Sequence, residues 1–506
     1  MTKLSIGPLN RITSSPHYKW WAYGAVAIGM FLSVMDQSGI NIALPQISEH
    51  FTADIPTVQW ITLGYSLATS AMLMPMGRLS DMIGRKEVYL IGYAGFVILA
   101  FVGGLSQSLA FLIAAKILQG IASAGVQANS MALITEVFPS NERGKAMGLY
   151  MTIIGTGAIS GPIMGGLIVS SFGWRWVFFA GIPVGILAML SAALILKGRN
   201  AQQSDRSGRG SFDWVGAALS SAALVVFLLA MTNGWKIGWT SAPILAGFVA
   251  AVVLLVAFII WELRVSDPML DLSLFSSRVF SLAISARFVQ FMGGSAIFFL
   301  MPFYLIQGLG YEASRAALLM IPGSLCMAIV SPLAGRLSDR FGTKWLAAAG
   351  AIFSAAGMFN LSLLSIESPA WQIILGIFLS GLGMATFSSP NTSAIMGSLT
   401  PDKYGIVSGF VNLARTSANV TGVAISTTFV TITMASYGYE PTLSVLTEGG
   451  GEGVRAAFVA GLNLALKVSF GLMLLALALT LFRTESPQPS PEPVGPAQRT
   501  PASGGD

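Results

Sequence analysis

A single carboxylate, that of Asp36, lies well inside a long apolar stretch of this chain, in the segment MDQSGINIALP. If that stretch is a helix rising about 1.5 Å per residue, Asp36 lies roughly 12 Å short of its outer end. A low-dielectric environment favours the protonated form of a carboxyl group. The acidic residues Glu136, Asp213 and Glu262 fall instead at the ends of apolar stretches. Asp36 is therefore the candidate to bind and release a proton.

A lysine, Lys116, occupies the matching depth in the fourth apolar stretch, roughly 12 Å below the outer surface by the same helix rise. A desolvated ammonium group loses its proton more readily than a guanidinium group does. Two hypotheses stay open for Asp36 and Lys116. The two groups could exchange a proton during a functional cycle, or they could form a static ion pair that holds two helices together.

Further basic and polar side chains fall inside apolar stretches, where a charge is costly unless it faces a cavity or a partner. Arg287, Arg415 and Lys467 are such cations, and the alternative for each is snorkelling or a bond to a carbonyl. Aromatic, amide and thioether groups make walls that accept ligands of many shapes. The candidates for a substrate cavity are Asn41, Gln59, Trp60, Tyr65, Gln127, Asn129, Arg287, Gln290, Asn412, Arg415 and Asn419.

The composition indicates which elements must position these residues. Hydrophobic residues make up 54% of the 506 residues and charged residues only 10%, which is too little polar surface for a water-soluble globule of this size. Apolar runs of roughly 20 residues recur between Trp20 and Phe482, about fourteen in all, and each could cross a bilayer as a helix. The sequence therefore predicts an all-α membrane protein with 14 transmembrane helices.

The runs are ordered as six, two and six, which predicts two pseudo-symmetric six-helix bundles with two additional central helices. The second span of each bundle is expected to end near residues 77 and 335, with a charged turn after it. The predicted divisions are a cytoplasmic N-terminus (1–18), an N-terminal six-helix bundle (19–196), a cytoplasmic loop (197–212), two linker helices (213–262), a cytoplasmic linker (263–278), a C-terminal six-helix bundle (279–482) and a disordered cytoplasmic tail (483–506).

A charged string occurs twice, as GRLSDMIGRK from Gly77 and as GRLSDRFGTK from Gly335. A tight connection needs glycine where backbones approach closely or φ is positive, and an aspartate there can cap a helix or pair with a cation. The repetition indicates an internal duplication. A second set of glycines recurs at nearly the same offset, namely Gly144, Gly148 and Gly161 as Gly405, Gly409 and Gly422.

Basic residues set the expected orientation in the membrane. With the N-terminus inside, roughly 20 of the 28 Lys and Arg residues lie in cytoplasmic segments against about 4 outside, so both termini are expected in the cytoplasm. The basic residues do not interleave with aromatic ones as on a nucleic-acid surface. One cysteine, Cys326, allows no disulfide framework or metal–thiolate site, and neither a metal nor a cofactor is expected.

The first charged string matches the pattern Gly-x-Leu-x-Asp-x-x-Gly-Arg-Lys. On this pattern the chain resembles the major facilitator superfamily, and specifically its fourteen-span drug:proton antiporters, over nearly everything from Trp20 to Phe482. The resemblance implies a latch that closes the cytoplasmic side between the bundles, whereas the alternative is a turn that only fixes topology. The implied latch residues are Gly77, Asp81, Gly84, Arg85 and Lys86, with Asp339 from the second copy.

A glycine pattern in the fifth run supports the same resemblance. Small residues at this spacing flatten one face of a helix, and a proline frees a backbone carbonyl and bends the helix. The pattern is similar to the antiporter motif of exporters, in which a bent helix at the interface of the bundles seals against leak, although close packing alone would also explain the glycines. Its residues are Gly157, Gly161, Pro162, Gly165 and Gly166.

The resemblance implies a proton-coupled secondary exporter of lipophilic compounds that works by alternating access, with Asp36 and Lys116 in proton coupling. The alternatives are a dedicated exporter of one physiological lipid, metabolite or osmolyte, and a proton symporter, which the Gly-Pro segment disfavours. One acid within the apolar stretches against four cations there, Lys116, Arg287, Arg415 and Lys467, favours neutral, monocationic or anionic substrates over dications.

We expect a transporter and not an enzyme, since no nucleophile with its base and no phosphate-binding loop is evident. Its expected partners are protons, a small lipophilic substrate and the lipid of a cytoplasmic membrane, with no nucleic acid, and we expect a monomer.

Overall fold

The computed structural model describes residue 15 and residues 17–53, 55–58, 60–198, 212–266, 268–311, 313–400, 403–439 and 451–483. Helices occur throughout these ranges, which contain no strand. Gln59 and nearly all of the predicted N-terminus, cytoplasmic loop and tail lie outside the described residues.

Six long helices form the N-terminal bundle. A one-turn helix, α3 (Ile55–Val58), separates the first two, and a short 3₁₀ helix, η1 (Ser140–Glu142), precedes the fifth. The six are α2 (Tyr18–His50), α4 (Trp60–Ile83), α5 (Arg85–Gly104), α6 (Leu109–Val137), α7 (Arg143–Phe172) and α8 (Arg175–Ile195).

Two linker helices, α10 (Trp214–Ile237) and α11 (Ala242–Glu262), precede the C-terminal bundle. The described order of six, two and six long helices confirms the predicted fold class. The shorter elements here are η2 (Leu272–Ser276) and η3 (Tyr304–Gly308). The helices of the C-terminal bundle are α12 (Arg278–Phe303), α13 (Ala313–Phe341), α14 (Thr343–Leu361), α15 (Ala370–Gly397), α16 (Tyr404–Ser436) and α18 (Glu452–Leu481).

Twelve of the fourteen long helices in the described ranges are long and apolar enough to cross a membrane. The two that fall short are α4, which carries the charged string at its end, and α14, which is rich in alanine and glycine. On α11 the apolar side chains of Leu245, Val249 and Val252 are exposed. A helix that is apolar on its exposed face needs lipid and not water around it.

The charged strings are helical, which corrects the expectation that they form turns. Residues 77–83 continue α4 and residues 335–341 continue α13. Only the next glycine leaves the helix, with φ of 118° at Gly84 and 87° at Gly342, a region that residues with a side chain rarely adopt. The string residues therefore project from a rigid helix end.

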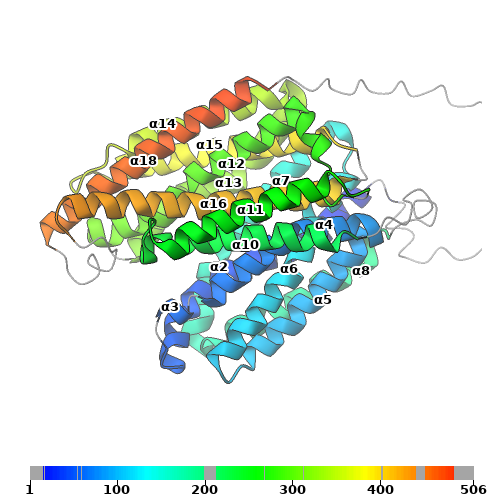
Figure 1. The fold of residues 1–506 in the computed structure, drawn as a ribbon, viewed down its shortest axis with the longest axis horizontal. Helices are drawn as coiled ribbons and strands as arrows, with labels where there is room; N and C mark the ends of the chain where they lie inside the picture. The colour runs from blue at the N-terminus through cyan, green and yellow to red at the C-terminus, as the bar shows by residue number, and fades with distance from the viewer. Residues whose placement is uncertain are drawn as a thin grey trace, which may run out of the picture.

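The two bundles are inclined to each other and come together where α4 and α13 end and α7 and α16 begin (Figure 1). We call this the latch end, and it is the end predicted to be cytoplasmic. Of the two linker helices, α10 packs against α4 and α16, and α11 packs against α10. Ser221 of α10 donates to the carbonyl of Ala71 in α4 at 2.8 Å.

Two acids hold the linker helices at the latch end. Asp213 accepts from the backbone N–H of Gly216 at 2.8 Å and from the indole of Trp261 at 2.9 Å. Glu262 accepts from the backbone N–H of Leu270 at 3.1 Å. Both acids stand at helix ends, as the sequence indicates, yet they are only 7% and 4% exposed. The chain after α11 folds back over Glu262, which the sequence does not reveal.

Candidate functional site

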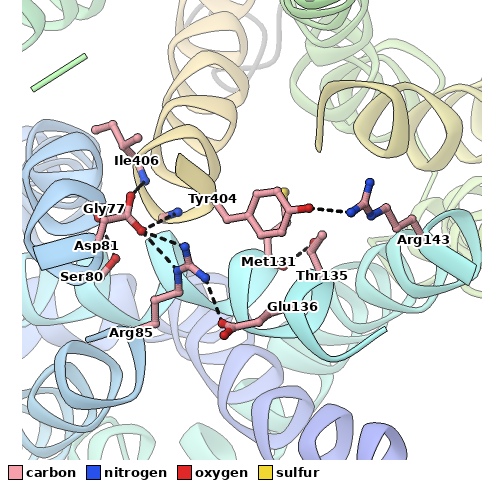
Figure 2. Close-up of polar contacts among 11 residues, drawn as sticks. Gly77, Ser80, Asp81, Arg85, Met131, Thr135, Glu136, Arg143, Tyr404 and Ile406 are labelled. Atoms are coloured by element: carbon pink, nitrogen blue, oxygen red, sulfur yellow. Dashed lines mark hydrogen bonds and ion pairs between the residues drawn. The ribbon is translucent and has the colours of Figure 1, made fainter. Parts of the chain in front are cut away.

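Asp81 caps the first turn of a helix in the other bundle (Figure 2). Its Oδ1 accepts the backbone N–H of Gly405 at 3.0 Å, and its Oδ2 accepts that of Ile406 at 2.8 Å. The first N–H groups of a helix have no carbonyl partner within the helix, and a negative charge there also complements the helix dipole. Asp81 thus joins the end of α4 to the start of α16.

Two arginines extend this contact on either side of Tyr404, as Figure 2 shows. Arg85 donates to Asp81 at 3.2 and 3.0 Å and to Glu136 at 2.9 Å. Arg143 donates to the Tyr404 hydroxyl at 2.7 Å. The guanidinium carbons lie 5.7 and 5.8 Å from the centre of the Tyr404 ring, within cation–π range.

The second copy of the string makes the reciprocal contact. Asp339, at the end of α13, accepts the backbone N–H groups of Gly144 at 2.6 Å and Lys145 at 2.9 Å, at the start of α7. An aspartate of each bundle therefore caps a helix of the other. Only the tertiary structure gives this exchange of partners.

Glycine lets the paired helices approach closely at these caps. A Cβ atom on Gly77 would crowd the carbonyl of Gly405, and one on Gly335 would overlap the carbonyl of Gly144. Of the recurring glycines, four lie where the bundles touch, and two contact a helix of their own bundle. The four are Gly144, Gly148, Gly405 and Gly409, and the two are Gly161 and Gly422.

Lys86 differs from the rest of the string. Its Nζ donates to the carbonyl oxygens of Ala193 at 2.7 Å and Leu196 at 2.6 Å, near the end of α8. A cation there complements the negative end of the α8 dipole. Its described hydrogen bonds therefore stabilise its own bundle.

Asp36 and Lys116 form an ion pair inside the N-terminal bundle. Lys116 Nζ lies 2.9 Å from Asp36 Oδ2, and the two side chains are 2% and 8% exposed. The ammonium group also lies 5.4 Å from the ring centre of Tyr65 and 4.9 Å from that of Phe178. The equal depths calculated from the sequence thus correspond to direct contact.

A group of hydrogen-bonded hydroxyls lies next to this ion pair. The Tyr65 hydroxyl donates to Ser123 Oγ at 2.7 Å, and Ser33 Oγ lies 3.0 Å from the same oxygen. Gln127 Nε2 donates to it at 3.0 Å. Sequence reasoning found Tyr65 and Gln127 but missed the serines, because a serine in an apolar helix commonly bonds its own backbone.

The glycine pattern of α7 faces α2 around Asp36. A Cβ on Gly157 would contact Val34, and one on Gly161 would overlap the Ser38 hydroxyl. Of the other members, Gly165 approaches Gly39 and Gly166 lies near Ile42, and the helix is continuous through position 162. These contacts stay within the N-terminal bundle, whereas the resemblance implied the interface of the bundles. Instead, α7 reaches α13 through Gly144, Gly148 and Gly155.

The other predicted cavity residues are spread over both bundles. Asn412 donates to the carbonyl of Gln127 at 3.2 Å and so links α16 to α6. Arg287 donates to Thr392 at 2.7 Å within the C-terminal bundle. The exposed candidates among the described residues are Asn41 and Trp60, and those partly exposed are Arg415 and Asn419. The buried candidates are Gln127, Asn129, Arg287, Gln290 and Asn412.

A cavity of about 40 Å³ lies inside the C-terminal bundle. Gln290, which donates to Ser354 at 2.7 Å, is the predicted residue that lines it. Such a volume holds a few water molecules, so a larger ligand requires the flexible methionines or the helices to move. The methionines of its wall are Met320, Met327, Met358, Met384 and Met473.

Comparison with known proteins gives a consistent result. The sequence model of the Major Facilitator Superfamily matches residues 26–423 and 284–504. The chain is 30% identical to the riboflavin transporter RibZ of Clostridioides difficile (strain 630), covering 81% of this chain and 88% of that protein. It is 31% identical to the multidrug resistance protein Stp of Mycobacterium tuberculosis (strain CDC 1551 / Oshkosh), covering 79% of this chain and 74% of Stp.

The fold is also that of a solved transporter. The proton:xylose symporter XylE superposes with a TM-score of 0.64 at 16% identity, over 92% of this chain and 96% of XylE. The duplicated strings, the reciprocal caps and the family match agree, and this multi-pass membrane protein belongs to the major facilitator superfamily.

Proposed function

We propose that this protein is a proton-coupled exporter that moves small lipophilic compounds out of the cell by alternating access. The observation that carries the proposal is the buried ion pair of Asp36 and Lys116. The name of a relative, the multidrug resistance protein Stp, agrees with export.

Because of the ion pair, protonation of Asp36 changes which conformation of the protein is favoured. When Asp36 binds a proton, Lys116 loses its counter-charge in a site that is almost closed to water. Removing one partner of a buried pair costs about 3–5 kcal/mol. The protonated protein therefore favours any arrangement in which Lys116 gains water or another partner, and the unprotonated protein favours the paired one.

Proton and substrate need not touch for transport to be coupled. Coupling requires only that protonation and substrate binding favour different conformations. The reciprocal caps of Asp81 and Asp339 supply contacts that exist in only one of those conformations, because they close the latch end. The glycine face of α7 positions α2, which carries Asp36.

A dedicated exporter of a single compound is the second candidate. The relative RibZ is named for one compound, riboflavin.

The test is transport by the purified protein in liposomes with an imposed pH gradient, with sulforhodamine B and rhodamine 6G as probes. An antiporter moves dye toward the acidic compartment, and a symporter moves it toward the alkaline one. We expect Asp36→Asn to abolish the gradient-driven movement and to retain dye exchange without a gradient.

The matched control is Glu49→Gln, which removes an exposed carboxylate from the same helix. It should transport like the unaltered protein. Normal gradient-driven transport by Asp36→Asn would refute the coupling role and leave a static ion pair.

A further inference from the structure

Two arginines of the C-terminal bundle stand on helices that pack against each other, α12 and α16, and neither has a carboxylate partner in the described residues. The guanidinium group of Arg287 in α12 interacts electrostatically with that of Arg415 in α16. The described residues form five salt bridges, and neither arginine takes part in one. Arg287 is completely buried. Like charges in such a site repel each other and lack hydration.

One edge of the Arg287 guanidinium group is unused. Nη1 donates to Thr392, but Nε and Nη2 are buried and have no hydrogen-bond partner among the described residues. Nε and Nη2 together form the fork with which arginine binds a carboxylate through two parallel hydrogen bonds. On Arg415, Nε is also buried without a partner in the described chain.

A tyrosine of the other bundle completes this cluster. Tyr150 of α7 is buried, and its hydroxyl interacts electrostatically with Arg287 and Arg415. The side chain of Asn412 in α16 lies next to this hydroxyl, which makes no hydrogen bond of ordinary geometry in the described residues. Sequence reasoning missed Tyr150, because the arginines that distinguish it belong to helices α12 and α16, far away in the chain. The three side chains come from α12, α16 and α7, and therefore from both sides of the interface between the bundles.

We propose that Arg287, Arg415 and Tyr150 bind the anionic group of the exported compound, so that the substrates are organic anions such as carboxylates or sulfonates. This inference rests on the proposed function and names its substrate class. An anion would give the unused guanidinium edge of Arg287 two hydrogen-bond acceptors, would accept from the Tyr150 hydroxyl, and would reduce the repulsion between the arginines.

The position of the cluster suits a substrate site that is separate from the proton site. Arg287 and Arg415 lie about 14 and 16 Å along their helices from the latch end, and Asp36 about 27 Å from the start of α2. Because Tyr150 moves with the N-terminal bundle and the arginines with the C-terminal bundle, an anion bound between them would sense the angle between the bundles.

Equilibrium binding to the purified full-length protein in detergent tests this inference without a pH gradient. The probes are sulforhodamine B, which is anionic, and rhodamine 6G, a cation on the same ring system. We expect Arg287→Gln and Arg415→Gln each to weaken sulforhodamine B binding by roughly 10- to 100-fold. Rhodamine 6G binding should stay unchanged or become tighter.

Two milder variants guard against misfolding at the buried Arg287. Tyr150→Phe removes only the hydroxyl, and Arg415→Lys keeps the charge but loses the fork, so both should weaken binding of the anion by less. The control is Lys467→Gln, which removes an exposed cation of α18 outside the cluster and should change neither dye.

Equal weakening of both dyes, or no weakening of either, would overturn the inference. A site that binds only chloride would also overturn it. In that case chloride would raise the thermal stability of the protein, Arg287→Gln would abolish this effect, and the affinity for sulforhodamine B would stay unaltered. A failure of the proposed function would be seen in a different experiment. The unaltered protein would then show no gradient-driven dye transport, while the effects of these variants on dye binding would remain.

Discussion

Asp81 and Asp339 each use both carboxylate oxygens to accept two backbone N–H groups of the other bundle. An asparagine offers one acceptor oxygen and turns a donor toward the second N–H group. Leaving a buried N–H group unpaired costs about 1–3 kcal/mol. A single oxygen atom in each string therefore contributes measurably to closing the latch end.

We expect Asp81→Asn to slow transport by roughly 5- to 100-fold, because that cost raises the free energy of the closed state. Dye affinity should change little, since Asp81 is remote from Arg287 and Arg415. The measurement is dye exchange together with equilibrium binding. Asp339→Asn should act in the same direction, and Arg336→Gln, an exposed change in the same string, should have no effect. If Asp81→Asn transports at the normal rate, the string does not act in closure and serves only to fix the orientation of the chain in the membrane.

A third acid, Asp271, lies between α11 and α12 and pairs with Lys403, just before α16, at 2.5 Å. The hydrogen bond from Lys403 lowers the pKa of Asp271 to about 2. A lowered folded-state pKa gives stability that is present above the ordinary value of about 3.9 and is lost as the pH falls toward 2.

We therefore expect Lys403→Gln to lower the melting temperature by a small amount that is constant between about pH 5 and 8. The effect is small because both side chains are partly exposed and water screens the pair. Thermal unfolding of the variant and the unaltered protein over this range is the measurement. A difference that varies across the range would contradict the assignment.

At the scale of elements, α7 has two faces with different partners. Its first turns contact α13 of the other bundle through Gly144, Gly148 and Gly155, and its later glycines contact α2. The same helix therefore touches both the latch end and the helix that carries Asp36. Small residues allow such backbone approach in a membrane, where helices gain no hydrophobic energy from meeting each other.

We expect Gly335→Ala to reduce transport strongly, because the added Cβ overlaps the carbonyl of Gly144 and keeps the latch end from closing. The measurement uses Ser389, whose hydroxyl donates to that carbonyl at 2.9 Å. In a Cys326→Ser background, a cysteine at position 389 should react faster with a thiol reagent when Gly335→Ala is present than when it is absent. Gly471→Ala is the control, since no atom lies within 4 Å of its added Cβ. If both alanine variants behave alike, the close approach at Gly335 has no role in closure.

At the scale of the whole molecule, the charged residues to which we assign a role are divided between the bundles. The pair of Asp36 and Lys116 lies in the N-terminal bundle, and Arg287 and Arg415 lie in the C-terminal bundle. The two caps that join the bundles are at the latch end. The proposed rocking of the bundles would change the distance between Tyr150 and the arginines, and α10, which packs against both α4 and α16, would have to follow it.

The amino-acid sequence by itself determined the helices and their order. An apolar run of about 20 residues must be helical in lipid, because no water is there to satisfy the backbone. The same logic singled out Asp36, Lys116, Arg287 and Arg415, since a charge inside such a run needs a partner wherever it lies. The duplication was also visible, as two copies of one string.

Which residues face each other was decided by the tertiary structure alone. Asp81 caps a helix more than 320 residues later in the chain, and the helical end of the string, expected as a turn, is what aims it there. Tyr150, Ser33 and Ser123 became candidates only once their helices were packed together. The position of a residue along its helix gives its depth in the membrane, but it does not say which neighbouring helix the side chain meets.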